Sequence, residues 1–169
     1  MVNPRSHSGL APVMRAEVRD LRRRTTSRRP FRPRFRTWAV DAERTPVGAP
    51  GEDLLAHFPA SALPMSASVS DHGLRVDLLI GWWTTVSTWT AERVTRSAPG
   101  APSVMGMLDR PGALELSTTD LAWWRSWRTA CAIAEQPVGP MVVLTRHGWI
   151  DVETEQVVAV SRYHRRAAA

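Results

Sequence analysis

Positive charge is concentrated at the two ends of this 169-residue chain, and that segregation restricts which residues can share a folded core. Residues 1–36 hold eleven Arg against two acidic residues, whereas residues 37–161 hold eight Arg against fourteen acidic residues. Like charges at the density of the first segment repel one another and resist close packing. The pattern therefore predicts a basic, largely disordered arm over residues 1–36, a single domain over residues 37–161 and a short basic tail over residues 162–169.

The middle segment has the composition of a folded domain. Hydrophobic residues make up 43% of the chain and eight of them are Trp, which is enough apolar surface for a real core. All 22 basic residues are Arg, a bias that a GC-rich genome produces along a whole chain. The number of arginines is therefore weak evidence of function, and their placement is the informative feature.

Cysteine usage and hydropathy indicate a protein of a reducing compartment. Cys131 is the only cysteine, so no internal disulfide can form, and no Cys/His group has the spacing of a structural zinc site. The longest strictly apolar run, residues 78–83, is far shorter than the ~20 residues that cross a bilayer. We expect a cytoplasmic protein without a membrane segment.

Hydrophobic periodicity and turn residues predict an α+β domain. Helices are expected at residues 13–24, 52–58, 84–97 and 120–135, and strands at residues 35–40, 66–70, 74–80, 104–108, 113–116, 141–144 and 150–160. The strands at 66–70 and 74–80 would form a hairpin around Asp71-His72-Gly73. From residue 74 onward the order is strand, helix, strand, strand, helix, strand, which is the split βαβ order of a ferredoxin-like sandwich or an elaborated relative.

The arginines of the N-terminal segment are candidates for contact with nucleic acid or another polyanion, because guanidinium groups neutralise phosphates. Phe31, Phe35 and Trp38 lie among them and would be able to stack on bases. Two alternatives remain open: a solvated tail, or a start codon assigned too far upstream, since Met14 is also available. The candidate nucleic-acid-binding residues are Arg22, Arg23, Arg24, Arg28, Arg29, Arg32, Arg34 and Arg36.

The tryptophans are expected chiefly in the core, because Trp brings a large apolar side chain and adjacent pairs place one ring inside. Trp124 shares a stripe with Leu121 and Cys131 and is predicted to anchor the helix at residues 120–135. An exposed Trp would mark a protein interface. The interface candidates are Trp82, Trp83 and Trp123.

One polar cluster invites a chemical interpretation. His147 is expected at the end of a strand, followed by Asp151, Glu153 and Glu155 alternating along one face of the next. That spacing is too wide for one small ion and is typical of a solvated strand face. We therefore predict that His147 is dispensable, and we expect no metal, no cofactor and no catalytic residue.

No nucleotide-binding, nucleophile-elbow or metalloprotease motif occurs in the sequence. The sequence favours a non-catalytic binding or assembly protein whose Arg-rich arm contacts nucleic acid or another polyanion. A structural or protein-interaction subunit of an oligomer or phage-like assembly is the alternative, with a possible homo-oligomer and the arm on an acidic protein surface. A small enzyme that uses the cluster from His147 to Glu155 comes third.

Overall fold

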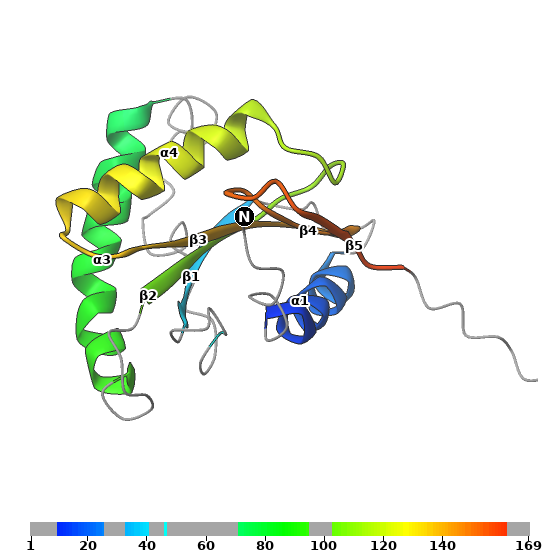
Figure 1. Ribbon diagram of the computed structural model, residues 1–169, viewed down its shortest axis with the longest axis horizontal. Helices are drawn as coiled ribbons and strands as arrows, with labels where there is room; N and C mark the ends of the chain where they lie inside the picture. Colours follow the sequence, from blue (N-terminus) through cyan, green and yellow to red (C-terminus); the bar gives the residue numbers. More distant parts are fainter. Residues whose placement is uncertain (1–9, 26–32, 41–45, 47–70, 95–102, 162–169) are drawn as a thin grey trace, which may run out of the picture.

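The computed structural model describes residues 10–25, 33–40, 46, 71–94 and 103–161, and in these residues the chain forms an α+β fold. Three helices and one five-stranded mixed sheet make up the described elements (Figure 1). The predicted helix at residues 52–58 and the predicted strand at residues 66–70 lie outside them.

The sheet runs in chain order, β1-β2-β3-β4-β5. Its strands β2 and β3 are parallel and directly hydrogen-bonded, and every other neighbouring pair is antiparallel. In a split βαβ unit another strand separates the parallel pair, so the described strands do not form the ferredoxin-like arrangement that we expected. The strands are β1 (Arg34–Val40), β2 (Ser103–Asp109), β3 (Val138–Thr145), β4 (Gly148–Asp151) and β5 (Val157–Ala159).

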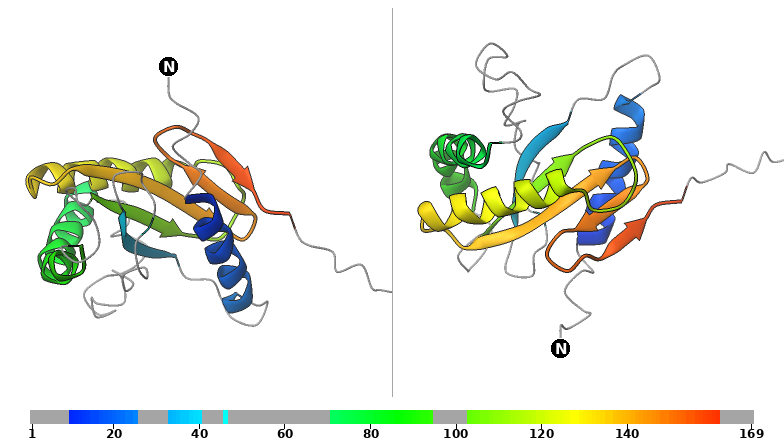
Figure 2. Two further views of the ribbon diagram at one scale, coloured as in Figure 1. Left: turned by 60° about the horizontal axis from the view of Figure 1, so that its bottom comes forward. Right: turned by 90° about the horizontal axis from the view of Figure 1, so that it is seen from above.

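Helices cover both faces of the sheet, so the described elements form three layers. Side chains alternate between the faces, as the pleat requires. Helix α1 (Leu10–Arg24) packs on one face, against residues such as Met107 and Leu144. Helices α3 (His72–Val94) and α4 (Thr118–Ile133) pack against each other, and both join the apolar core on the other face (Figures 1 and 2).

The helix predicted at residues 120–135 is confirmed as α4, and its start has the expected cause. The Ser117 hydroxyl accepts a hydrogen bond from the Asp120 amide, and the Asp120 carboxylate accepts one from the Ser117 amide.

Close packing of α4 on the sheet depends on Gly106, where a Cβ atom would lie 3.0 Å from the Phe35 ring. The Trp127 indole then donates to the Gly139 carbonyl at 3.1 Å and ties α4 to β3.

The hairpin predicted around Asp71-His72-Gly73 is wrong, because these residues begin α3. The Asp71 carboxylate accepts from the amides of Gly73 at 2.8 Å and Leu74 at 3.4 Å, which is the geometry of a helix N-cap. The following apolar run is helical, with Leu78, Leu79 and Trp82 on the buried side. The helix predicted at residues 84–97 is the continuation of α3 as far as Val94.

Two further strand predictions need correction. Residues 113–116 form no strand; they belong to the loop between β2 and α4. The strand predicted at residues 150–160 is two strands, β4 and β5, because the chain turns at Val152. The strands predicted at residues 35–40, 104–108 and 141–144 are confirmed as parts of β1, β2 and β3, and β3 is the central strand of the sheet.

The N-terminal segment contributes two elements to the described fold. Its helix α1 buries Leu10, Met14, Val18 and Leu21 against the sheet, and β1 begins at Arg34. The boundary expected at residue 36 therefore falls inside β1. Helix α1 belongs to the core as well, because its apolar residues recur every three or four positions and form one buried face despite the arginines between them.

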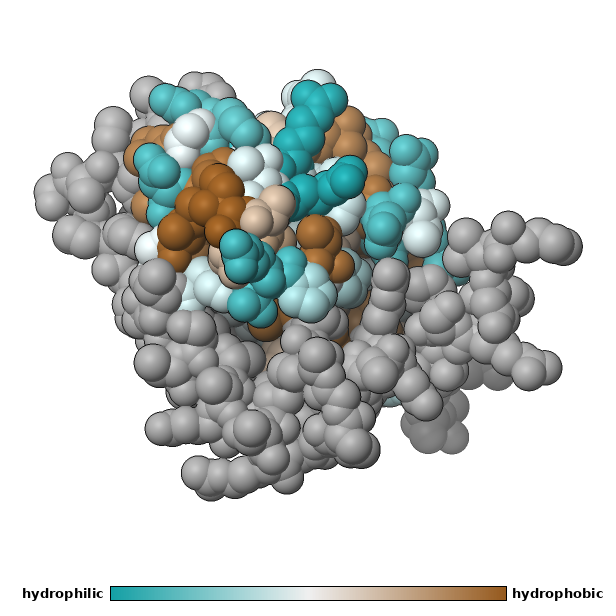
Figure 3. All heavy atoms as spheres, turned by 60° about the vertical axis from the view of Figure 1, so that its left-hand side comes forward, coloured by the Kyte–Doolittle hydropathy of each residue, from teal (hydrophilic) through white to brown (hydrophobic). Residues whose placement is uncertain are grey.

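The end of the molecule where α4 meets β3 exposes a few apolar side chains among polar ones (Figure 3). Ile133 at the end of α4 is 58% exposed and Val138 at the start of β3 is 46% exposed. Among the described helices, none is long and apolar enough to cross a membrane.

Candidate functional site

Helix α1 carries opposite charges on its two flanks. With about 3.6 residues per turn, Arg15, Arg19 and Arg22 follow one flank of the buried apolar stripe, whereas Glu17 and Asp20 lie on the other. The spacing of four and three residues keeps each group on its own side of the helix. The sequence of α1 therefore turns a basic edge toward one part of the sheet and an acidic edge toward another.

The basic flank borders a hollow of about 760 Å³ between α1, the β3–β4 turn and the end of β5. Its wall includes Arg146 from the turn between β3 and β4, and the chain that follows β5 completes it. Of the described residues that line the hollow, none is acidic. The lining residues are Arg15, Arg19, Arg22, Arg146, Ala159, Val160 and Ser161.

Arg22 joins the two walls of the hollow. Its Nε atom donates to the Arg146 carbonyl and its Nη2 atom to the Val160 carbonyl, each at 2.6 Å. The Val160 amide in turn donates to the His147 carbonyl at 2.8 Å. Arg22 therefore fixes α1 relative to the β3–β4 turn, while Arg15, Arg19 and Arg146 are exposed to solvent.

The acidic flank of α1 meets a buried ion-pair network beneath the helix. Arg36, which is 5% exposed, places its Nη2 atom 2.9 Å from Glu17 Oε2 and 2.9 Å from Asp109 Oδ2. Asp109 has no exposed surface. Arg36 is thus a structural residue engaged with two carboxylates, which corrects its assignment to a polyanion-binding surface.

Burial sets the pKa values of this network. Desolvation raises the pKa of the Asp109 carboxyl above its usual range, although the nearby Arg36 opposes the shift. Desolvation also acts to lower the pKa of the Arg36 guanidinium, but attraction to Asp109 and Glu17 outweighs it and leaves the pKa raised. The arginine therefore stays charged and holds α1 to the sheet through Glu17.

The other predicted arginines have different positions. Arg23 is exposed on α1, and Arg24 pairs with Asp20 on the acidic flank. Arg34 is exposed at the start of β1. Arg28, Arg29 and Arg32 lie outside the described residues, as does Phe31.

The aromatic residues expected to stack on bases belong to the core. Phe35 has no exposed surface and Trp38 is 5% exposed. Phe35 stacks on Trp123 with the ring centres 5.0 Å apart and the ring planes 18° apart. Neither ring can reach a ligand at the surface.

The tryptophan assignments are partly wrong. Trp82 and Trp123 are each 3% exposed, so neither can serve as the interface residue that we expected. Trp83 is half-buried and packs beside Trp127. Trp124, predicted to be the core anchor, is also half-buried, and the Arg128 guanidinium covers its ring at 5.6 Å.

The cluster from His147 to Glu155 does not converge. His147 is exposed in the β3–β4 turn, whereas Asp151 is buried at the end of β4. The Asp151 carboxylate accepts from the Glu153 and Thr154 amides at 2.9 and 3.1 Å and so caps the turn into β5. The acids therefore share no strand face, and the described residues hold no group of three potential metal ligands.

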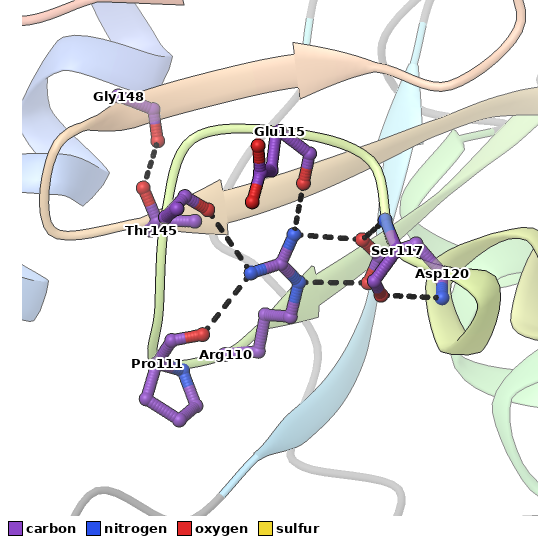
Figure 4. Close-up of polar contacts among 8 residues, drawn as sticks. Arg110, Pro111, Glu115, Ser117, Asp120, Thr145 and Gly148 are labelled. Carbon is purple, nitrogen blue, oxygen red and sulfur yellow. Dashed lines mark hydrogen bonds and ion pairs between the residues drawn. The ribbon is translucent and has the colours of Figure 1, made fainter.

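The loop from β2 to α4 lies at the carboxyl ends of the parallel strands, where ligands of α/β folds often bind. Here Arg110 occupies that position, and it is fully engaged (Figure 4). Its Nε and Nη2 atoms donate to the two carboxylate oxygens of Asp120 at 2.8 and 2.7 Å. Nη2 also donates to the Glu115 carbonyl, and Nη1 donates to the carbonyls of Pro111 and Ala113. Arg110 thus has no N–H left for a ligand, and it shapes the loop.

Ser126 and His72 form a contact that superficially resembles a nucleophile and its base. The Ser126 Oγ atom lies 3.0 Å from His72 Nδ1 and accepts from Arg75 Nε at 3.0 Å. Ser126 has no exposed surface and donates to the Ala122 carbonyl. A substrate has no access to this hydroxyl, so the contact joins α3 to α4.

Comparison with known proteins gives no assignment, because no family model, no curated protein and no solved structure matches this chain.

Three arginines of the basic hollow are absent from the candidate residues predicted from the sequence. Arg15 and Arg19 contributed to the charge count of the first 36 residues but were not singled out, and Arg146 was not considered as a binding residue. The spacing of Arg15, Arg19 and Arg22 in a helix with an apolar stripe was a detectable signal. The contribution of Arg146 depends on a contact across 124 positions of sequence and had no local signal.

Proposed function

We propose that this protein is a non-catalytic binding protein that contacts nucleic acid through the basic hollow beside α1. The observation that carries the proposal is the convergence of four arginines on one hollow with no acidic residue in its described lining. Guanidinium groups suit phosphate oxygens because their planar fork donates two parallel hydrogen bonds.

The arrangement of the described ion pairs supports this assignment. Arg24, Arg36 and Arg110 are each matched with carboxylates of the same chain. Three other arginines line the hollow and are exposed: Arg15, Arg19 and Arg146. None of the ion pairs named above, all between described residues, involves them. Like charges held together repel, and an anionic partner relieves that repulsion.

The basic surface proposed here differs from a free N-terminal arm. Deleting residues 1–36 would remove the apolar face of α1 and the first strand residues, so such a truncation would test stability as well as binding. Point substitutions at exposed arginines separate the two effects, because surface changes of this kind usually alter stability by less than about 0.5 kcal/mol.

The test compares the full-length protein with an Arg15→Ala/Arg19→Ala variant in an anisotropy assay with labelled nucleic acid at low salt. We expect the double variant to bind at least about tenfold more weakly, since two phosphate contacts are lost. Arg125→Ala is the matched control, because Arg125 is exposed on α4, across the sheet from α1. Equal binding by the double variant and the wild type would refute the proposal.

A further inference from the structure

We infer that the basic hollow takes the sugar-phosphate backbone of a double helix rather than a single strand. This inference rests on the proposed function and specifies the form of its nucleic-acid partner. Two features of the described chain lead to it: the absence of an aromatic ring among the lining residues of the hollow, and the fixed backbone positions from which its arginines extend.

Single-strand binding sites combine basic residues with aromatic rings on which successive bases stack, and each stacked base contributes about 1–3 kcal/mol. The hollow has no ring among its described lining residues; Ala159 and Val160 form its uncharged wall. Trp149 follows the β3–β4 turn closely but is 4% exposed and faces the core beneath α1. The described half-buried tryptophans, Trp83 and Trp124, lie on α3 and α4, which pack on the opposite face of the sheet from α1.

The backbone positions from which the arginines extend are also fixed relative to one another. Arg15 and Arg19 lie one helical turn apart, which is about 6 Å along the axis of α1. Arg146 provides a third point away from that axis, and the two hydrogen bonds of Arg22 fix its turn against the helix. The basic hollow therefore presents its arginines from a fixed frame, in which Arg22 is held by hydrogen bonds and the exposed side chains extend toward solvent.

A fixed backbone frame favours a partner that is itself rigid and densely charged. Duplex DNA carries one negative charge per about 1.7 Å of its axis and bends only over a persistence length of about 50 nm. A single strand must be ordered on binding, and the described lining residues offer no stacking to offset that entropy. Because phosphate contacts carry no sequence information, we expect binding to be independent of duplex sequence.

The experiment measures affinity of the full-length protein for a mixed-sequence duplex and for an oligothymidylate of the same length, which forms no hairpin. Anisotropy titrations over a series of salt concentrations are run on the wild type, on Arg15→Ala/Arg19→Ala and on the control Arg125→Ala. We expect the duplex to bind at least about fivefold more tightly than the single strand, and two duplexes of different sequence to bind alike.

The outcomes separate this inference from the function on which it rests. Duplex preference that is lost in the double variant but kept in the Arg125→Ala control supports both. Equal or tighter binding of the single strand, still weakened in the double variant, overturns the duplex inference and leaves the nucleic-acid function standing. Binding of both ligands that is unchanged in the double variant, or no binding of either, overturns the proposed function and the inference with it.

Discussion

Replacing Asp109 by Ala should destabilise the protein strongly, because it leaves a buried cation without its main partner. Asp109 has no exposed surface, and its two oxygens lie 3.1 and 2.9 Å from Arg36 Nη2. In the variant, Glu17 on the rim of the network is the remaining acidic partner of Arg36. Breaking a buried pair in this way typically costs about 3–5 kcal/mol. For a chain of this size that corresponds to a fall in Tm of about 6–20 °C.

The assay is urea unfolding followed by tryptophan fluorescence, with two comparison variants. Arg24→Ala removes the more exposed pair with Asp20 and should cost only about 0.2–1 kcal/mol. The double variant Arg36→Met/Asp109→Leu replaces both buried charges by apolar groups and should recover most of the stability lost in Asp109→Ala. A loss below about 1 kcal/mol for Asp109→Ala, or a double variant no more stable than the single one, would refute the assignment of a buried ion pair that holds α1.

Two further predictions concern side chains of the core. Trp123→Ala should cost about 3–5 kcal/mol in free energy of unfolding, and Trp124→Ala clearly less, because only the first ring is buried against Phe35; equal losses in a denaturant melt would contradict this. Desolvation raises the pKa of the Cys131 thiol to about 11, so the native protein should resist thiol reagents at about pH 8, where an unfolded thiol of pKa about 8.5 reacts. Because the thiol pKa is higher in the folded state than in the unfolded state, the contribution of the neutral thiol to stability is fully present below the unfolded pKa and is lost as pH rises toward about 11. The Cys131→Ala variant should lack that part of the pH dependence of the free energy of unfolding.

The parts of the fold that were predictable are those with a local cause. Helix α4 could be located because Ser117 and Asp120 form its capping box and Pro137 follows its end. The three longest strands, β1, β2 and β3, were found from their hydrophobic patterns and from the turn residues near them. Each of these signals lies within the element that it specifies.

The secondary-structure predictions failed where one short sequence pattern is compatible with two local structures. Asp71 followed by Gly73 is equally typical of a hairpin turn and of a helix N-cap, and the short apolar run after it has no decisive period. Trp123 and Trp124 are adjacent, so a shift of one residue in the estimated helix face exchanged their roles. The pairing of Arg110 with Asp120, which shapes the loop over residues 113–116, has no periodic signature at all.

The polyanion contact stays a prediction, and the sequence could not indicate which arginines lie together on one surface. The excess of arginine in the first 36 residues indicated a polyanion-binding segment. The charge count alone did not show that Arg36 would be buried with Asp109 while Arg15 and Arg19 would face a hollow. That division follows from the docking of α1 on the sheet, which is a tertiary contact.

The most direct test of the account is the salt dependence of duplex binding by the wild type and by an Arg15→Ala/Arg19→Ala/Arg146→Ala variant. Each phosphate contact contributes about 0.9 to the slope of log affinity against log salt concentration, so the triple variant should have a slope shallower by roughly 2.7. Its urea midpoint should match that of the wild type, since all three side chains are exposed. An unchanged slope in a stably folded triple variant would contradict the central claim that the basic hollow binds the phosphate backbone.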